Sequence, residues 1–351
     1  MDFVARGRRV VFYGLPSELR GLSARAPGDP LFVDEVLYTA YPAAEVGRAA
    51  QPDSLTPVVS LKEAIASATD IVFAPRYRSI EDPEARLQEI RSHLEVLAPF
   101  LDERVLINAL PVGPGEGSQI EEFIAGRIGR RPRYVYAPVG PDGSVRYIGV
   151  REGDAPEWLL RATKGEVLGV EEAEAAHIGE VLSRSIPAIV RGVTGSGPPT
   201  GYMRDAFMGA LESFLLGANA DPGSSAYSLY TLVKRALEEY LKRLTSLLKD
   251  AIRGSGMKVS RARLLVLWTP DEGSARGDER WALEKLKGAL SSSFVDVEFA
   301  GIEGLRGLER RDVIIVCTRR DEESLSRIRL EGRIMVRALY PRPEVGGLKA
   351  A

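Results

Sequence analysis

Cysteine is almost absent from this chain: its 351 residues contain one, Cys317. A single thiol excludes an internal disulfide framework, and it leaves a cysteine-based zinc site without the further ligands that it needs. The run Asp312–Thr318 is apolar, as in a buried strand, so we interpret Cys317 as a packed core thiol. Histidine is nearly as rare. His93 and His177 lie in helical stretches with no carboxylate or cysteine at metal-ligand spacing, so the sequence predicts no metal site.

Long apolar runs are missing too. No segment approaches the roughly 18 residues of a membrane span, and Met1–Arg6 lacks the apolar core of a signal peptide. The formal net charge of −2 provides no global basic field that would attract nucleic acid or an anionic membrane. We therefore expect a cytoplasmic protein without membrane or nucleic-acid partners. Arginine far outnumbers lysine and methionine is scarce, which favours a thermophilic source.

The sequence does contain apolar, β-rich runs that alternate with helical stretches, in a chain long enough for two or three domains. In residues 1–150 the alternation is typical of βαβ units on a parallel sheet. Residues 151–255 lose the strand signal and predict a helical middle domain. Residues 256–351 predict a second, smaller α/β domain that ends in a tail from Pro341.

The predicted elements follow from apolar periodicity and from turn residues. The first domain has strands at Arg9–Gly14, Glu35–Ala40, Ile71–Ala74, Val105–Ala109 and Tyr134–Ala137, a short helix capped by Ser60, and a helix at Glu84–Leu97. The middle domain has helices at Glu171–Ser183, Met203–Leu216 and Ser228–Ile252, with a connector at Gly192–Gly201. The last domain has strands at Arg263–Trp268, Val295–Phe299, Asp312–Thr318 and Arg333–Ala338, and helices at Arg280–Leu290 and Glu322–Leu330.

A loop that opens the longest predicted helix carries the most informative motif. The run Asp221-Pro222-Gly223-Ser224-Ser225 resembles the Gly-Gly-Ser-Cys-x-x-Lys-Asp segment of UDP-glucose/GDP-mannose-type nucleotide-sugar dehydrogenases, with Ser225 in the place of the cysteine. Four further segments resemble this family in the same order along the chain: Ser60–Pro75, Leu110–Gly115, Tyr136–Gly143 and Leu267–Arg276. The resemblance covers most of the chain.

This resemblance implies an N-terminal Rossmann-like domain, a helical middle domain that dimerises through residues 228–252, and a smaller Rossmann-like domain. It also implies NAD as the cofactor, with Gly14 and Pro75 near it, and a nucleotide sugar as the substrate. Gly223 and Arg276 correspond to substrate-binding positions. The family reaction oxidises a sugar alcohol to an acid through a thiohemiacetal on the cysteine.

The cofactor motif departs from the family pattern. A dinucleotide fold needs Gly-x-Gly-x-x-Gly after the first strand, so that the backbone can approach the pyrophosphate at a helix N-terminus. This chain has Gly14-Leu15-Pro16-Ser17-Glu18-Leu19, which keeps only the first glycine. The second strand, as predicted, ends at Ala40 instead of at an acidic residue, although Asp34 or Glu35 serves if the strand lies earlier. The sequence therefore leaves the cofactor unknown.

The catalytic positions depart as well. Serine is a much poorer nucleophile than a thiolate unless a base lies beside it, and the Lys-Asp pair of the motif is replaced by Ser228-Leu229. Leu110 and Val139 stand where the family has a threonine and a glutamate. Arg204 and Met208 replace the lysine and asparagine of the middle helix. We therefore predict a catalytically impaired homologue that binds a nucleotide sugar or acts as a scaffold, beside an active paralogue for example.

Several alternatives stay open at this stage. One is an active NAD-dependent oxidoreductase with a rearranged site. Arg276 fits either a substrate contact or an ordinary charged loop. The basic clusters Arg127–Arg133 and Lys234–Lys249 fit a phosphate or nucleic-acid site, but the second is interleaved with acidic residues and fits a solvated helix face better. The apolar stripe of Ser228–Ile252 fits either a core contact or a homodimer contact.

Overall fold

The structure is a computed structural model that describes residues 9–14, 16–28, 31–33, 58–59, 65, 68–75, 80–140, 143–194, 201–269, 278–300, 311–325 and 333–346. The chain divides into two compact units. Unit 1 consists of Met1–Val181, Phe214–Tyr227 and Glu272–Gly277. Unit 2 consists of Leu182–Ser213, Ser228–Asp271 and Asp278–Ala351. The segment predicted as a middle domain, 151–255, contributes to both units.

Unit 1 contains an eight-stranded sheet in the order β3-β2-β1-β4-β5-β6-β7-β8. Its strands are β1 (Val10–Gly14), β2 (Leu31–Val33), β3 (Val58–Val59), β4 (Asp70–Ala74), β5 (Val105–Asn108), β6 (Arg133–Tyr136), β7 (Tyr147–Val150) and β8 (Glu166–Leu168). Neighbouring strands are parallel except β6 and β7. The first six follow the Rossmann order, and the direction of the chain across the sheet reverses between β1 and β4. Ligands of such sheets bind at the carboxyl ends of the strands beside this reversal.

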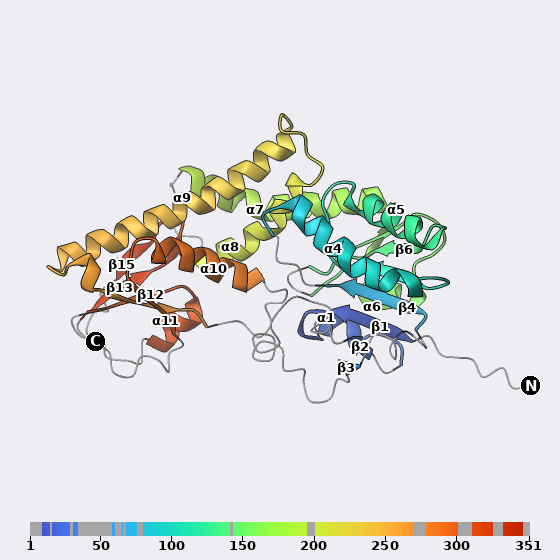
Figure 1. Ribbon diagram of the computed structural model, residues 1–351, viewed down its shortest axis with the longest axis horizontal. Helices are drawn as coiled ribbons and strands as arrows, with labels where there is room; N and C mark the ends of the chain where they lie inside the picture. The colour runs from blue at the N-terminus through green and yellow to red at the C-terminus, as the bar shows by residue number, and fades with distance from the viewer. Residues whose placement is uncertain are drawn as a thin grey trace, which may run out of the picture. The chain divides into compact units, whose positions relative to one another are not determined.

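The central strands of unit 1 are apolar and buried, as is typical of a parallel sheet covered on both faces. The helices of unit 1 are α1 (Pro16–Ser23), α4 (Pro83–Leu97), α5 (Glu116–Ile128), α6 (Glu157–Thr163) and the first half of α7 (Val170–Thr194). Asp82 caps α4 by accepting a hydrogen bond from the Ala85 amide at 3.0 Å. Figure 1 shows α4 and α5 side by side on the sheet.

Unit 2 contains a smaller sheet in the order β11-β10-β12-β13-β15. Its strands are β10 (Arg263–Leu267), β11 (Asp296–Ala300), β12 (Asp312–Val316), β13 (Ile334–Arg337) and β15 (Glu344–Gly346), and β9 (Gly201–Tyr202) pairs with β14 (Leu339–Tyr340). Its helices are the second half of α7, α8 (Met203–Leu211), α9 (Ser225–Gly254), α10 (Asp278–Ser291) and α11 (Arg319–Leu325). The first four strands of the main sheet are parallel, so unit 2 is a second Rossmann-like sheet whose order reverses between β10 and β12.

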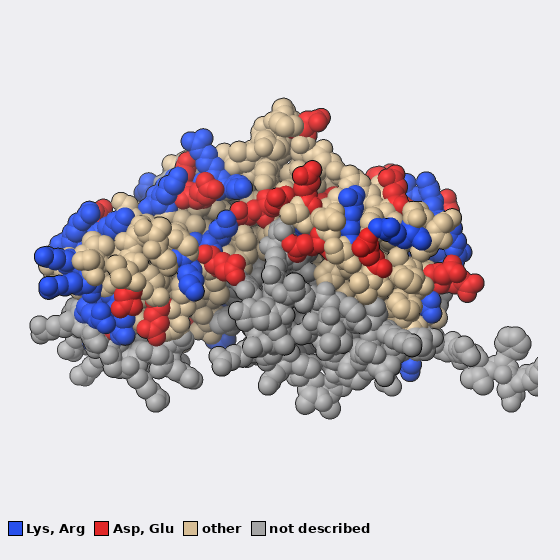
Figure 2. All heavy atoms as spheres, viewed as in Figure 1, with Lys and Arg blue, Asp and Glu red and all other residues tan. Residues whose placement is uncertain are grey.

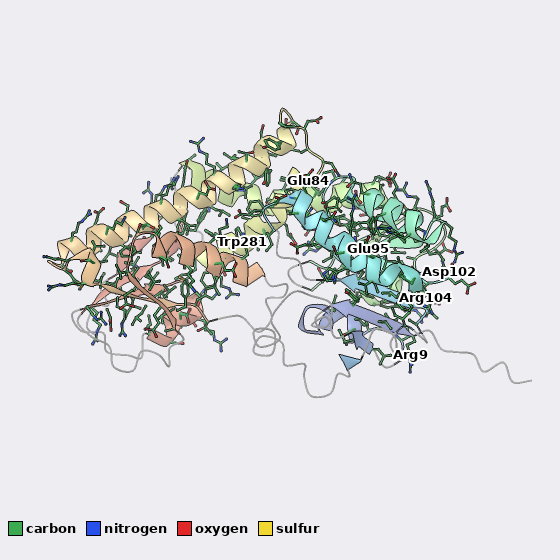
Figure 3. All side chains as sticks on the ribbon, in the orientation of Figure 1. Arg9, Glu84, Glu95, Asp102, Arg104 and Trp281 are labelled. Carbon is green, nitrogen blue, oxygen red and sulfur yellow. The ribbon has the colours of Figure 1, made fainter. Side chains whose placement is uncertain are left out.

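The apolar stripe of α9 lies in the core of unit 2. Its buried residues recur at helical spacing: Val233, Ala236, Leu237, Tyr240, Leu241, Leu244, Leu248 and Ile252. The Phe207 ring packs 6.0 Å from that of Tyr240 and 5.9 Å from that of Trp281, which Figure 3 labels on α10. The chain itself therefore buries this stripe.

Most predicted elements are confirmed within one to three residues at each end, and several are corrected. The helix predicted at Glu171–Ser183 continues to Thr194, through Pro187. Strands β8 and β9 occur where no strand was expected, because three-residue and two-residue strands carry no periodicity. The expected tail contains β15, which is ordered by pairing with β13. The strand predicted at Glu35–Ala40 lies outside the described residues.

Among the described residues, no helix combines the length and apolar character that crossing a membrane requires. Within the same part of the chain, no group of three His, Cys, Asp or Glu side chains could hold a metal ion.

Candidate functional site

The first part of the candidate site is the carboxyl edge of β1 and β4. Gly14 pairs with Ala74, and Pro75 follows directly, so the structure brings the two predicted cofactor positions together. A Cβ on Gly14 would lie 2.5 Å from the Ala74 carbonyl oxygen. Glycine is therefore needed here because the two strands approach closely, whether or not a ligand binds.

The turn after β1 does not fit a dinucleotide pyrophosphate. Helix α1 begins at Pro16, which has no amide hydrogen to offer to a phosphate. Leu19 stands at the position of the third glycine of the fingerprint, is 1% exposed, and has Cδ1 3.2 Å from the Cβ position of Gly14. A leucine that fills this space replaces the close helix-to-strand packing that the third glycine provides.

The second strand of the sheet lies earlier in the sequence than predicted. The predicted strand Glu35–Ala40 placed Ala40 at the position that contacts the cofactor ribose, but the strand beside β1 is β2, which ends at Val33. The next residue in the sequence is Asp34, an acidic residue of the type that this position requires. Asp34 itself lies outside the described residues.

The second part of the site is the turn Leu110–Gly117, which leads from β5 into α5. Its amides have acceptors within the chain. The Leu110 and Val112 amides donate to Asn108 Oδ1 at 3.1 Å and to the Tyr136 hydroxyl at 3.3 Å. The Gly113 amide donates to Glu116 Oε2 at 2.6 Å, and the Glu116 amide donates to the Gly113 carbonyl at 3.1 Å.

Glu174, on α7, supplies the remaining acceptors of this turn. Its two carboxylate oxygens accept the Gly115 and Gly117 amides, each at 3.0 Å. Residues 111 and 114 are prolines and have no amide hydrogen. Every backbone N–H group of the turn Leu110–Gly117, which contains a segment that resembles the family, therefore donates a hydrogen bond to another group of the chain.

Two buried carboxylates and one guanidinium surround this turn. Arg86, on α4, donates to both oxygens of Glu116 at 2.5 Å, and each side chain is 1% exposed. Glu174 is 2% exposed. Burial raises the pKa of Glu174 to about 7, against the lowering effect of the two amide hydrogen bonds, and Glu171 and Glu116 raise it further.

The loop that precedes α9 contacts this turn. Asn219, with a positive φ of 54°, donates from Nδ2 to the Pro114 carbonyl at 2.9 Å and accepts from Gln119 Nε2 at 2.6 Å. A Cβ on Gly113 would overlap the Leu215 carbonyl and the Ala218 side chain. Within unit 1, the segment Leu215–Asn219, which leads to the loop Asp221–Ser225, therefore contacts the turn Leu110–Gly115 that resembles the family.

Ser225 is the first residue of α9 and is exposed. Its neighbour Ser224 is the helix cap, because Ser224 Oγ accepts the Tyr227 amide at 3.1 Å. Among the described residues, no side chain that could act as a base is hydrogen-bonded to Ser225 Oγ. Gly223 is exposed too, and a Cβ there would meet nothing within 4 Å.

The other predicted positions lie in another unit, in the core of unit 1 or outside the described residues. Arg204 lies on α8 in unit 2, whereas Ser225 belongs to unit 1, and Arg276 lies outside the described residues. Leu110 and Val139, at the matched threonine and glutamate positions, are 5% and 4% exposed and pack in the core of unit 1.

Cys317 follows β12 in unit 2 and is 0% exposed, as the sequence predicted. Burial raises the pKa of its thiol, with a further contribution from Asp321. The single thiol of the chain is therefore a poor nucleophile.

In unit 2, a buried carboxylate joins the strands beside the reversal of strand order. Asp321 is 0% exposed and accepts hydrogen bonds from the Thr269 amide at 3.0 Å and from Thr318 Oγ1 at 2.6 Å. Thr269 follows β10 and Thr318 follows β12. The segment resembling the substrate-binding loop, Leu267–Arg276, is therefore anchored at its start.

Sequence reasoning missed Arg86, Glu116, Glu174, Asn219 and Asp321. Each acts through contacts with residues between 3 and 105 positions away. The one local signal was Gly-Glu-Gly at 115–117, because two glycines beside the start of a helix indicate close approach of another group.

No protein-family model matches the chain, and no curated protein matches it in sequence. Solved structures match its fold. A UDP-D-ManNAc dehydrogenase from Pyrococcus horikoshii aligns with a TM-score of 0.62 at 16% identity, over 88% of this chain and 89% of that one. A UDP-glucose dehydrogenase from the hyperthermophilic archaeon Pyrobaculum islandicum aligns with a TM-score of 0.61 at 13% identity, over 97% and 96%.

A third match is an NDP-N-acetyl-D-galactosaminuronic acid dehydrogenase from Methanosarcina mazei, with a TM-score of 0.53 at 12% identity over 89% and 86% of the two chains. The chain has a nucleotide-sugar dehydrogenase-like fold, with Rossmann-like α/β units. At these identities the likeness concerns the fold alone.

Proposed function

We propose that this protein binds a nucleotide sugar without oxidising it, as a sensor or as a scaffold subunit. The observation that carries the proposal is the lack of a usable nucleophile. Oxidation through a thiohemiacetal needs a thiolate, and the one cysteine of the chain is fully buried with a raised pKa. Ser225, at the matched position, is an exposed first-turn serine with no base beside it among the described residues.

The β1–α1 turn supports the same proposal. Pro16 and Leu19 remove a phosphate donor and fill the space of a fingerprint glycine, so the turn does not fit NAD in the usual way. The turn Leu110–Gly117 has no backbone donor left for a ligand. We therefore derive no hydride transfer from this site.

A nucleotide-sugar ligand is supported by the names of the similar structures and by the distribution of charge. The sequence of unit 2 contains 26 Lys and Arg against 19 Asp and Glu, whereas unit 1 contains 21 against 30. Figure 2 shows Lys and Arg side chains gathered near the C-terminal end of α9, in unit 2. A diphosphate is attracted to the positive unit.

The test is calorimetric titration with UDP-glucose and UDP-N-acetylmannosamine, followed in parallel by absorbance at the NADH wavelength in the presence of NAD. We expect binding without NADH formation. The variant Arg276→Ala weakens binding, whereas Arg161→Ala, an exposed cation on α6 of unit 1, leaves it unchanged. NADH formation would overturn the proposal that the protein does not oxidise its ligand. Failure of both sugars to bind would overturn the proposal that the ligand is a nucleotide sugar.

The second candidate function is an NAD-dependent oxidoreductase that acts on a nucleotide sugar. One observation favours it. Strand β2 ends at Val33, so the next residue in the sequence, Asp34, stands where a dinucleotide fold has the acidic residue that contacts the cofactor ribose. NAD titration of the wild-type chain and of Asp34→Ala tests it, with the exposed Glu152→Ala as the matched control. Loss of NAD binding in Asp34→Ala alone would support this candidate, and no NAD binding by the wild type would exclude it.

A homodimer through residues 228–252 is part of the first proposal. The buried stripe of α9 is already used by unit 2, so only the outer face of the helix is left for a second copy. That face carries Arg235, Glu238 and Lys242, and Arg235 is paired with Glu239 at 3.0 Å. Light scattering of wild type and Glu238→Arg measures the mass, and a monomeric wild type would refute the dimer. A cytoplasmic location remains a prediction.

A further inference from the structure

The C-terminal end of α9 and the loop that follows it are rich in cations. Residues 242–263 contain seven lysines and arginines but one acidic residue, Asp250. Figure 2 shows these blue side chains gathered at that end of the helix. The net charge of −2 for the whole chain therefore conceals a local positive surface on unit 2.

This surface lies at the amino edge of the sheet of unit 2. The short helix η4 (Val259–Arg261) leads into β10, which begins at Arg263. Arg263 is in register with the first residue of β11, so Val295, which precedes that strand, lies at the same edge. Lys249 Nζ donates to Ser293 Oγ at 3.0 Å and joins the end of α9 to this segment. Ligands of Rossmann-like sheets bind at the opposite, carboxyl edge.

The cations at this edge outnumber the carboxylates that they can pair with. Among the described residues, no ion pair joins Lys249, Lys258 or Arg261 to a carboxylate. The nearby carboxylates already have arginine partners: Asp250 has Arg253, Asp296 has Arg311, and Asp312 and Glu298 share Arg263. Three cations are therefore left to pair with a group from outside the chain.

An exposed apolar side chain accompanies these cations. Val295 is 86% exposed, more than any other large hydrophobic residue in the described part of the chain. Met257 and Val259, in the loop between α9 and β10, are half-buried. A nucleic-acid backbone has no apolar group that would cover a valine, and a lone valine is a poor anchor in a membrane. A protein partner can satisfy both the charges and the apolar side chain.

We propose that Lys249, Lys258, Arg261 and Val295 form a basic edge that docks an acidic segment of another protein. The carboxylates of the segment pair with the three cations, and an apolar side chain of the segment covers Val295. The basic edge lies beyond the outer face of α9 assigned to the homodimer and at the opposite edge of the sheet from a Rossmann ligand. The proposal therefore depends on neither the dimer nor the nucleotide sugar.

Fluorescence anisotropy on the full chain tests the basic edge with three labelled probes. The first is a peptide of glutamate, leucine and serine, the second is the same peptide with each leucine replaced by serine, and the third is a DNA duplex. We expect the first peptide to bind most tightly, and added salt to weaken its binding because salt screens exposed charges. UDP-glucose does not displace it.

Charge reversal locates the binding surface. The double variant Lys249→Glu with Lys258→Glu weakens binding of the first peptide by about tenfold, since two exposed ion pairs are lost. The matched double variant Arg319→Glu with Arg320→Glu changes the net charge equally but lies on α11, at the carboxyl edge of the same sheet, and leaves binding unchanged. Val295→Ser weakens binding of the first peptide and leaves the second unaffected.

A footprint on the wild type needs no variant, so it holds even if a double variant fails to fold. The first peptide slows hydrogen exchange of amides 253–262 and leaves those of α11 unchanged. The proposal is overturned if the wild type does not bind the first peptide, if the duplex or the leucine-free peptide binds as tightly, or if both double variants lose binding equally.

Discussion

Arg86 on α4 and Glu116 on α5 form a buried ion pair in which one guanidinium nitrogen lies 2.5 Å from both carboxylate oxygens. Each side chain is 1% exposed, and Glu116 also accepts the Gly113 amide. The pair therefore ties a helix on the face of the sheet to the turn at its carboxyl edge.

Removal of one partner of this pair leaves the other as an uncompensated buried charge. We expect Arg86→Met to lower the free energy of unfolding by about 3–5 kcal/mol. The double variant Arg86→Met with Glu116→Leu recovers part of this loss, because no charge is left buried. Urea unfolding measures both. If the double variant loses at least the sum of the two single effects, the pair is not coupled as described.

Gly117 and Gly126 lie on the same helix and differ in their surroundings. A Cβ at 117 meets Glu174 Oε1, whereas a Cβ at 126 meets nothing within 4 Å. Gly117→Ala is expected to destabilise by about 1–3 kcal/mol through overpacking. Gly126→Ala is expected to stabilise by about 0.5–1 kcal/mol, because alanine favours an exposed helix interior. Equal effects in thermal unfolding would refute the contact with Glu174.

Ser224 and Ser225 are neighbours with different roles. Ser224 Oγ accepts the Tyr227 amide at 3.1 Å and caps α9, so Ser224→Ala costs about 1 kcal/mol of stability. Ser225→Ala is close to neutral, since its side chain is exposed. Chemical unfolding of the two variants compares them directly. A larger loss from Ser225→Ala would show a contact that the described residues do not contain.

The native thiol of Cys317 and the thiol introduced by Ser225→Cys differ in their exposure to solvent. Cys317 is 0% exposed, and burial raises its pKa, so iodoacetamide leaves the native chain unmodified at pH 8 and labels it in urea. Ser225→Cys adds one exposed thiol at a helix N-terminus, which labels rapidly in the native state. This variant still forms no NADH with UDP-glucose. Turnover by Ser225→Cys would show that only the nucleophile had been lost.

Leu244 distinguishes a core role of α9 from a dimer role. It is 0% exposed within the chain, so Leu244→Ala costs about 2–5 kcal/mol in unfolding free energy. The mass measured by light scattering stays that of the wild type. Ser246→Ala, an exposed change on the same helix, alters neither quantity. A change of mass without a change of stability would move the stripe to a subunit interface.

The sequence predicted most of the fold because its signals are local. The strands β1, β4, β5, β6, β10 and β12 are apolar runs between turn residues, and α9 shows its buried stripe as a repeat of three and four residues. Short strands escaped, since β8 and β9 span three and two residues and exist through pairing with distant segments. The motif order along the chain also predicted the Rossmann-like fold that the solved structures share.

By itself, the sequence determined that this chain has one cysteine, a serine at position 225 and a fingerprint with only its first glycine. The apolar run around Cys317 also predicted its burial, whereas tertiary structure alone decided that Leu19 fills the space of a missing glycine and that Glu174 reaches the turn 57 to 59 residues before it. The physical reason is that residue identity is written locally, whereas burial, hydrogen bonding and pKa depend on groups that only the folded chain brings within reach.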